Sequence, residues 1–376
     1  MSTLKVTTIQ DASGGNTATI NSMTPTADSL QGFRNRIING DMRIDQRNAG
    51  ASVTPANSAY TLDRWAAYTN GAGVYTVQQS STAPAGFVNS LLCTVTTIDS
   101  SVSGSDYYML QQNVEGLNVS DLGWGTANAK TVTISFWVRS SITGTYTVKL
   151  GNSASDRSYV ATYTISSANV FEQKTITIAG DTSGTWLTTN GVGIEIRFAM
   201  AIGSSFTTSS PNQWLAANVF GSTTASNNWI GTNGATFYLT GVQLEVGSVA
   251  TPFERRDYGR ELAMCQRYYW KLSASTGTRY GAGLCYLTTK AVIVVPFPVT
   301  MRVAPSTLEQ TGTATDYRLL NASGSGVACS SVPIFSTSNT SNAEIEFTVA
   351  SGIVAGNVTL GFSNSANGYL AWSAEL

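Results

Sequence analysis

Thr131-Val-Thr-Ile-Ser-Phe-Trp-Val138 is the stretch that decides the fold class of this chain. Its even-numbered residues are apolar and most of the others carry hydroxyl groups, which is the alternation of a half-buried β-strand. Five further runs share this pattern: residues 74–77, 145–150, 174–178, 192–198 and 236–244. Turns rich in Gly, Asn, Ser and Asp separate them. The pattern predicts an all-β protein with an antiparallel jelly-roll sandwich over residues 33–255.

Two further segments follow this domain. Around Arg255 the period changes, and Tyr258, Leu262, Cys265 and Tyr269 fall at helical spacing. We therefore expect a short linking helix from about Asp257 to Trp270, within a segment spanning residues 256–272. Alternating apolar runs at 291–297, 343–349 and 357–362 then predict a C-terminal β-sandwich over residues 273–376.

The composition excludes several classes of enzyme. The 376 residues include no histidine, so Ser-His-Asp triads, Cys-His pairs and His-ligated zinc are excluded. The net charge is −1, which gives no electrostatic case for nucleic acid. The four cysteines show no C-x-x-C spacing, and we expect them to be small core residues. We find neither a signal peptide nor a membrane span in the sequence and expect no membrane insertion.

Three stretches together carry a resemblance to a known group of proteins. They are residues 35–48 with Tyr60-Thr-Leu-Asp-Arg-Trp65, residues 237–254, and the Arg-Glu-Leu-Ala-Met-Cys-Gln-Arg-Tyr-Tyr run from Arg260. The chain resembles tail-fibre and other fibre-type virion structural proteins of tailed bacteriophages. Residues 3–10 are similar to the virion-proximal end of such proteins, so residues 1–32 are expected to attach the protein to the particle.

The resemblance implies a virion protein, assembled in the host cytoplasm as a homotrimer with other virion structural proteins as partners. Its C-terminal domain would form the trimeric tip. We expect Leu262, Cys265 and Tyr269 of three helices to pack near the threefold axis, with the neighbouring charges fixing the register. The jelly-roll domain would bind host-surface glycan, while a purely architectural role as capsid fibre, decoration or tail-adaptor protein is the main alternative.

Within that family the middle domain is similar to jelly-roll carbohydrate-binding modules. Asn39-Gly40-Asp41 matches the strand that opens such modules, and the run from Phe237 to Glu245 matches the strand that closes them beside it. Some of these modules hold a structural calcium there, and Asp41 and Glu245 are the matching carboxylates. The usual paired acids of the closing strand are replaced by Thr240-Gly241, so a plain turn with a salt bridge is the favoured alternative and no cofactor is assigned.

Aromatic side chains are the candidates for glycan contact. Asp63-Arg64-Trp65 could present Trp65 to a sugar, but a buried Trp65 beneath a surface pair of charges is the preferred interpretation. Aromatics in irregular Gly/Asn/Ser-rich segments are better candidates, because loops display binding residues. These are Tyr107, Tyr108, Trp124, Trp186, Trp214 and Trp229. For each of them the alternative is ordinary packing.

An enzyme on this chain would have to use carboxylates. Glycan cleavage needs two of them roughly 5 to 9.5 Å apart. Asp106, Glu115 and Asp121 form the one loose group of acids in a predicted loop region, and no coil-length repeat of a parallel β-helix occurs. The sequence therefore favours non-catalytic binding over a glycan depolymerase.

Overall fold

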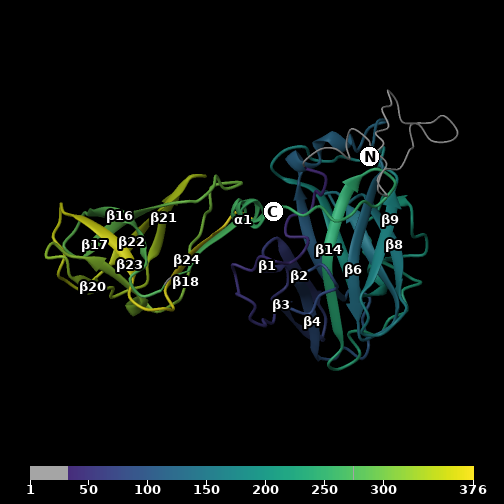
Figure 1. Ribbon diagram of the computed structural model, residues 1–376, viewed down its shortest axis with the longest axis horizontal. Coiled ribbons are helices and arrows are strands. Elements are labelled where there is room, and N and C mark those ends of the chain that lie inside the picture. The colour runs from purple at the N-terminus through teal and green to yellow at the C-terminus, as the bar shows by residue number, and fades with distance from the viewer. Residues whose placement is uncertain (1–32, 274) are drawn as a thin grey trace, which may run out of the picture. The chain divides into compact units, whose positions relative to one another are not determined.

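The computed structural model describes residues 33–273 and 275–376, so the expected leader, residues 1–32, lies outside the described residues. Strands dominate both parts of the chain, which confirms the all-β class (Figure 1). The chain divides into two compact units between Arg255 and Arg256. We describe each unit by itself.

The first unit is an antiparallel sandwich of two sheets. The seven-stranded sheet has the order β1 (Ala59–Leu62), β2 (Trp65–Asn70), β5 (Tyr107–Glu115), β10 (Val192–Ile202), β7 (Gly144–Gly151), β8 (Ser158–Ile165), β12 (Trp214–Leu215). The five-stranded sheet has the order β3 (Val74–Ser80), β4 (Ser90–Thr97), β14 (Thr236–Val246), β6 (Val132–Ser140), β9 (Glu172–Ile178). All six strands expected from alternation are present. The chain passes repeatedly from one sheet to the other, as in jelly-roll sandwiches.

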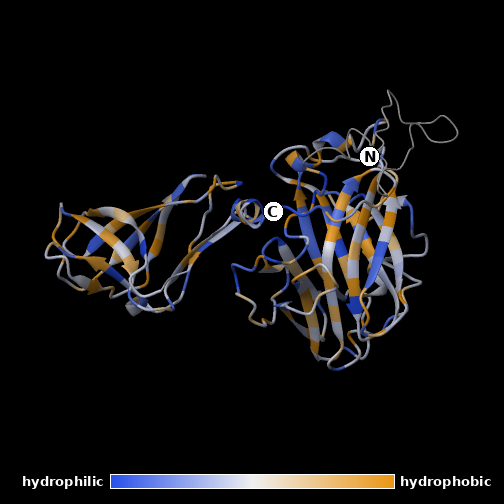
Figure 2. Ribbon diagram, in the orientation of Figure 1, coloured by the Kyte–Doolittle hydropathy of each residue, from blue (hydrophilic) through white to orange (hydrophobic). Residues whose placement is uncertain are grey.

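Short elements complete this unit. A small parallel pair joins β11 (Thr207–Thr208) to β13 (Gly221–Ser222). Single 3₁₀ turns lie at η1 (Gly116–Asn118), η2 (Ser120–Leu122) and η3 (Ser204–Phe206). These elements belong to the long connections at the ends and edges of the sheets, where Figure 2 shows mixed polar and apolar segments.

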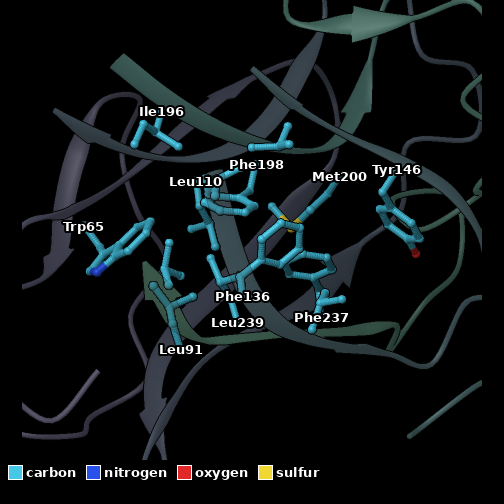
Figure 3. Close-up of a cluster of buried hydrophobic side chains, with 14 of the residues drawn as sticks. Trp65, Leu91, Leu110, Phe136, Tyr146, Ile196, Phe198, Met200, Phe237 and Leu239 are labelled. Carbon is cyan, nitrogen blue, oxygen red and sulfur yellow. The ribbon is translucent and has the colours of Figure 1, made fainter. Parts of the chain in front are cut away.

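The core lies between the two sheets, as the alternation predicts. From β6, the residues Val132, Ile134, Phe136 and Val138 are all fully buried. The Phe136 ring packs edge-on against Phe198 of β10, with ring centres 5.0 Å apart (Figure 3). The fully buried Trp65 is part of the same core. Because each sheet contributes one apolar face, neither sheet could persist in water without the other.

The expected opening segment does lie beside the closing strand. The Arg36 amide donates to the Leu244 carbonyl at 2.9 Å, and the Val242 amide donates to the Gly40 carbonyl at 2.9 Å. Gly40 is needed at this crossing, because a Cβ there would lie 2.2 Å from the Val242 carbonyl oxygen. Asn39 has a positive φ of 57°, which lets its side chain bond to the backbone of Ile44.

The Asp63-Arg64-Trp65 segment is a buried framework, and the expectation of a surface charge pair is wrong. Asp63 and Arg64 are 0% and 1% exposed. Asp63 accepts hydrogen bonds from the Gln46 amide and side chain, and the Arg64 guanidinium donates to the Asn113 carbonyl. Trp65 donates its ring N–H to the Asn39 carbonyl at 3.0 Å. It is fully buried, which excludes it as a sugar platform.

The second unit holds two antiparallel sheets with a core of their own. The seven-stranded sheet has the order β20 (Gly326–Ala328), β19 (Tyr317–Leu320), β23 (Val358–Ser363), β16 (Arg279–Cys285), β17 (Lys290–Pro296), β22 (Asn342–Thr348), β21 (Ile334–Ser338). The three-stranded sheet has the order β15 (Tyr269–Ser273), β24 (Tyr369–Ser373), β18 (Glu309–Gln310), and one 3₁₀ turn is η4 (Ala314–Asp316). The core between them includes Ile293, Ile345, Phe347 and Trp372.

The helix is shorter than expected and begins the second unit. It is α1 (Tyr258–Gln266), the one α-helix among the described residues, and no helix in that part of the chain could cross a membrane. Tyr269 lies in β15, where it pairs with Ser373 and donates its hydroxyl to Glu309 at 3.0 Å. It therefore shares no helical face with Leu262 and Cys265, and Cys265 is fully buried. The three side chains therefore cannot form the expected joint contact at a threefold axis. The homotrimer itself stays a prediction.

Candidate functional site

Three of the six candidate aromatics meet at one edge of the first unit. Trp124 follows η2, Trp186 lies in the connection between β9 and β10, and Trp214 begins β12. Their ring centres are 4.7 Å (Trp124–Trp186), 5.3 Å (Trp124–Trp214) and 5.4 Å (Trp186–Trp214) apart, and each pair is nearly perpendicular. We call these residues the tryptophan cluster. Trp124 is 7% exposed, while Trp186 and Trp214 are half-buried.

Each ring of the tryptophan cluster is fixed by a hydrogen bond to the backbone. The indole N–H groups of Trp124, Trp186 and Trp214 donate to the carbonyls of Lys130, Ser183 and Ala179, at 2.8, 3.0 and 2.7 Å. Because the polar edges are satisfied internally, the exposed parts of Trp186 and Trp214 are apolar ring surface. Edge-to-face packing of aromatic rings adds a modest further stabilisation.

The loop that carries Trp186 is held by an ion pair. Arg157 donates from Nε and a terminal nitrogen to the two carboxylate oxygens of Asp181, both at 2.7 Å, in bidentate geometry. The Gly125 amide donates to the Asp181 carbonyl at 2.7 Å, which ties the Trp124 loop to the same point. Bidentate Arg–carboxylate pairs fix geometry as well as adding energy. The cluster is therefore a preformed surface.

The space beside the cluster is too small to enclose a sugar. A cavity of about 20 Å³ lies between η2 and the Trp186 loop, lined in part by Leu122, Trp124, Trp186 and Ile194. That volume accommodates about one water molecule. A ligand at the tryptophan cluster has to lie on its surface and stack on the exposed ring surface of Trp186 and Trp214.

The other three candidates lie elsewhere. Tyr108 and Trp229 are completely buried in the sandwich core, so neither can contact a glycan. Tyr108 donates its hydroxyl to Asp99 at 2.7 Å, and burial together with this bond raises its pKa. Tyr107 is half-buried and packs on Phe206 and Phe220. Its strand β5 is four strands from β12, or about 19 Å across the sheet, so Tyr107 belongs to another surface.

Asp41 and Glu245 have separate side-chain partners. Asp41 pairs with Arg43 at 2.5 Å, and Glu245 lies 3.5 Å from Arg34. Glu245 also accepts a hydrogen bond from the Thr251 amide at 2.8 Å. No group of three or more His, Cys, Asp or Glu side chains suited to a metal occurs within residues 33–273 and 275–376. The salt bridges expected in the alternative are present, and a calcium ion at this place stays a prediction.

Within the loose group of acids, Asp106 and Glu115 do not form a catalytic pair. Asp106 immediately precedes β5 and Glu115 ends it, so nine residues of extended chain, about 30 Å, separate them. Asp121 pairs with Arg36 at 2.8 Å on another segment. The separation of Asp106 from Glu115 greatly exceeds the range in which two carboxylates cooperate in glycoside hydrolysis.

A buried charged group on the outer face of the seven-stranded sheet of the first unit was not expected. Lys149 of β7 and Arg197 of β10 are direct cross-strand partners, and both contact Glu195, at 2.9 and 3.0 Å. Phe220 covers the group, with the Arg197 guanidinium 4.4 Å from its ring centre. The sequence does place these charged residues inside two predicted strands, which could have indicated the group. It does not show that Phe220 covers them.

Comparison with known proteins finds likeness only among solved structures. No protein-family model and no curated protein matches the chain. The enzymatically active domain of bacteriophage CBA120 tailspike protein 4 is 12% identical over 58% of this chain and 22% of its own, with a TM-score of 0.33. The family 11 carbohydrate-binding module of Clostridium thermocellum Lic26A-Cel5E is 13% identical over 55% of this chain and 100% of its own, with a TM-score of 0.27.

A third similar structure is TmCBM61 in complex with β-1,4-galactotriose. It is 11% identical over 57% of this chain and 99% of its own, with a TM-score of 0.28. Sequence identities and TM-scores as low as these do not identify the function. The function is therefore argued from the residues of this chain.

Proposed function

We propose that the first unit binds a glycan at the tryptophan cluster without cleaving it, and that the protein is a fibre-type virion protein that uses this binding for adsorption to its host. The observation that carries the binding proposal is the cluster itself. Three large rings are held rigidly at one edge of the sandwich, and two of them are half-buried, with part of the ring open to solvent. The virion context rests on the resemblance of the sequence.

The rings suit the apolar face of a sugar. A pyranose presents C–H groups on one face and hydroxyl groups around its rim, so an indole stacks on the face while polar groups bond to the rim. Four exposed residues that carry hydroxyl groups are near Trp186 in the sequence: Thr182, Ser183, Thr185 and Thr188. Because the rings are already ordered, binding would lose little side-chain entropy.

The low charge of the chain supports a neutral ligand. Only 11% of the residues are charged, against about 25% in ordinary soluble domains. Binding through ring contacts and neutral hydrogen bonds would persist at high ionic strength, where exposed ion pairs are screened. Each contact would be weak, and many copies on one particle would raise the avidity.

The test is a glycan array probed with the labelled full chain, followed by calorimetry on the strongest ligand. We expect Trp186→Ala and Trp214→Ala each to raise the Kd about thirtyfold, the effect of losing an aromatic anchor worth about 2 kcal/mol. Tyr286→Ala is the matched control, because Tyr286 is a 41% exposed aromatic in the second unit. Its Kd should not change.

Three results would overturn the proposal. Glycan binding that is unchanged in both tryptophan variants would exclude the tryptophan cluster as the binding site. No glycan binding by well-folded protein would favour the architectural role as fibre, decoration or adaptor. Release of new reducing ends from a bound polysaccharide would identify a depolymerase instead.

A further inference from the structure

The seven-stranded sheet of the second unit has an apolar outer face. It consists of six residues on the three central strands β23, β16 and β17: Val358, Leu360, Ala282, Leu284, Val292 and Val294. Leu284 pairs with both Val292 and Val358, and Ala282 pairs with both Val294 and Leu360, so the six side chains form one continuous patch. We call it the outer apolar patch.

The outer apolar patch is unusually exposed. Val358 is 85% exposed, Leu284 48% and Val294 40%. The opposite face of the same strands is the core of the unit, where Ile293 is fully buried. Strand β17 is therefore apolar on both faces, the pattern of a strand covered on both sides. A contiguous exposed apolar patch of this kind marks an interaction surface.

Opposite charges flank the patch. Arg318 lies on β19, beside β23, and Glu344 lies on β22, beside β17. The guanidinium of Arg318 lies 4.2 Å from the ring centre of Phe362, and its buried Nε has no hydrogen-bond partner. Among the described residues, neither Arg318 nor Glu344 forms an ion pair. A cation is thus available on one side of the patch and an anion on the other.

We propose that the outer apolar patch binds the same patch of a second copy of this chain, around a twofold axis that runs along β16. The strand order supplies the reason, because β16 is the fourth of seven strands. A twofold axis along it places β23 of one copy over β17 of the other, so apolar side chains meet apolar side chains. It also places the β19 side over the β22 side, where Arg318 of one copy and Glu344 of the other lie two residues, about 7 Å, apart along the strands, within reach of two long side chains.

This arrangement differs from the threefold helix contact expected from the sequence. It is also independent of the proposed glycan binding, since the outer apolar patch lies in the second unit and the tryptophan cluster in the first. A pair of copies would present two tryptophan clusters and would so raise avidity if both functions hold.

The test is sedimentation of the full chain at tens of micromolar. We expect the wild type to sediment with twice the 39.7 kDa mass of one chain. Leu284→Lys and Val358→Lys should each weaken the pair at least about tenfold, because each buries an unpaired charge against its apolar partner. Both positions are exposed, so the fold of the unit should persist in circular dichroism. Val88→Lys, at a residue 68% exposed in the first unit, is the matched control and should leave the mass unchanged.

A charge exchange tests the twofold geometry. Arg318→Glu and Glu344→Arg should each weaken the pair, and the double variant should restore it, because the two long side chains of different copies lie within reach of each other. A monomeric wild type would overturn the proposal. So would a dimer or trimer whose mass is insensitive to Leu284→Lys and Val358→Lys, and failure of the double variant to recover would overturn the twofold axis along β16.

Discussion

At the scale of single residues, Lys149 is a charged side chain held in the interior of the first unit. It is fully buried beneath Phe220, and its ammonium group lies 2.9 Å from Glu195. Burial, helped by the nearby positive charge of Arg197, lowers the pKa of Lys149 to about 8, although Glu195 opposes the shift. The ion pair therefore offsets only part of the cost of removing the charge from water.

The lowered pKa predicts a dependence of stability on pH. In the folded chain Lys149 loses its proton near pH 8, and in the unfolded chain near its ordinary value of 10.5. Between these values the unfolded chain binds more protons, so the free energy of unfolding rises with pH. We subtract the free energy of unfolding of Lys149→Met from that of the wild type. We expect this difference to be constant below pH 8 and then to rise with pH, by at most about 3 kcal/mol.

Urea unfolding of the two proteins across this interval measures the difference, in which all other titrating groups cancel. Lys174→Met is the control, because Lys174 pairs with Glu172 near the surface. Its difference from wild type should not rise in this interval. A difference for Lys149→Met that falls as the pH increases would contradict the assignment.

At the scale of elements, the stability of the short helix α1 depends on the residue that caps its N-terminus. The Asp257 side chain accepts a hydrogen bond from the Arg260 amide at 2.9 Å and caps the first turn. A helix of nine residues is too short to be stable by itself, so the cap and its packing decide whether it forms.

We therefore expect Asp257→Ala to lower the free energy of unfolding of the second unit by about 1 kcal/mol. Asp257→Asn should retain most of the stability, because an amide oxygen caps as well as a carboxylate. Calorimetry of the full chain gives both values from the transition of this unit. If the Asn variant is as destabilised as the Ala variant, the carboxylate has a role other than capping.

At the scale of the whole molecule, the two units have separate hydrophobic cores. The core of the first unit draws on residues 37–244 and that of the second on residues 280–374. A domain can fold alone when it holds its own core.

This separation predicts that residues 33–255 and residues 256–376 each fold when produced separately. Thermal unfolding of each fragment, followed by circular dichroism, should show one cooperative transition, and the first fragment should retain any glycan binding. A fragment that is unfolded by itself would mean that one unit requires the other.

Much of this fold was predictable because strand formation is local. A pleated strand turns successive side chains to opposite faces, so alternation such as Val132, Ile134, Phe136, Val138 reports burial without knowledge of any partner. The same argument located all six expected strands of the first unit. The position of Gly40 beside Val242 was expected from the resemblance to carbohydrate-binding modules instead. The helix was misjudged at its end, because Tyr269 pairs with Ser373, which is more than a hundred residues away.

The site was predictable only in part. Trp186 and Trp229 occur in similar Gly-, Ser- and Asn-rich segments, yet Trp186 is half-exposed and Trp229 packs in the core, 5.6 Å from Tyr75. Strand periodicity, composition and the absence of histidine follow from the sequence by itself, and they determined the all-β class and excluded histidine chemistry. Strand order is set by pairings between distant segments, so only the tertiary structure decided which tryptophans meet, that Phe220 covers Lys149, and that apolar residues remain exposed over β16.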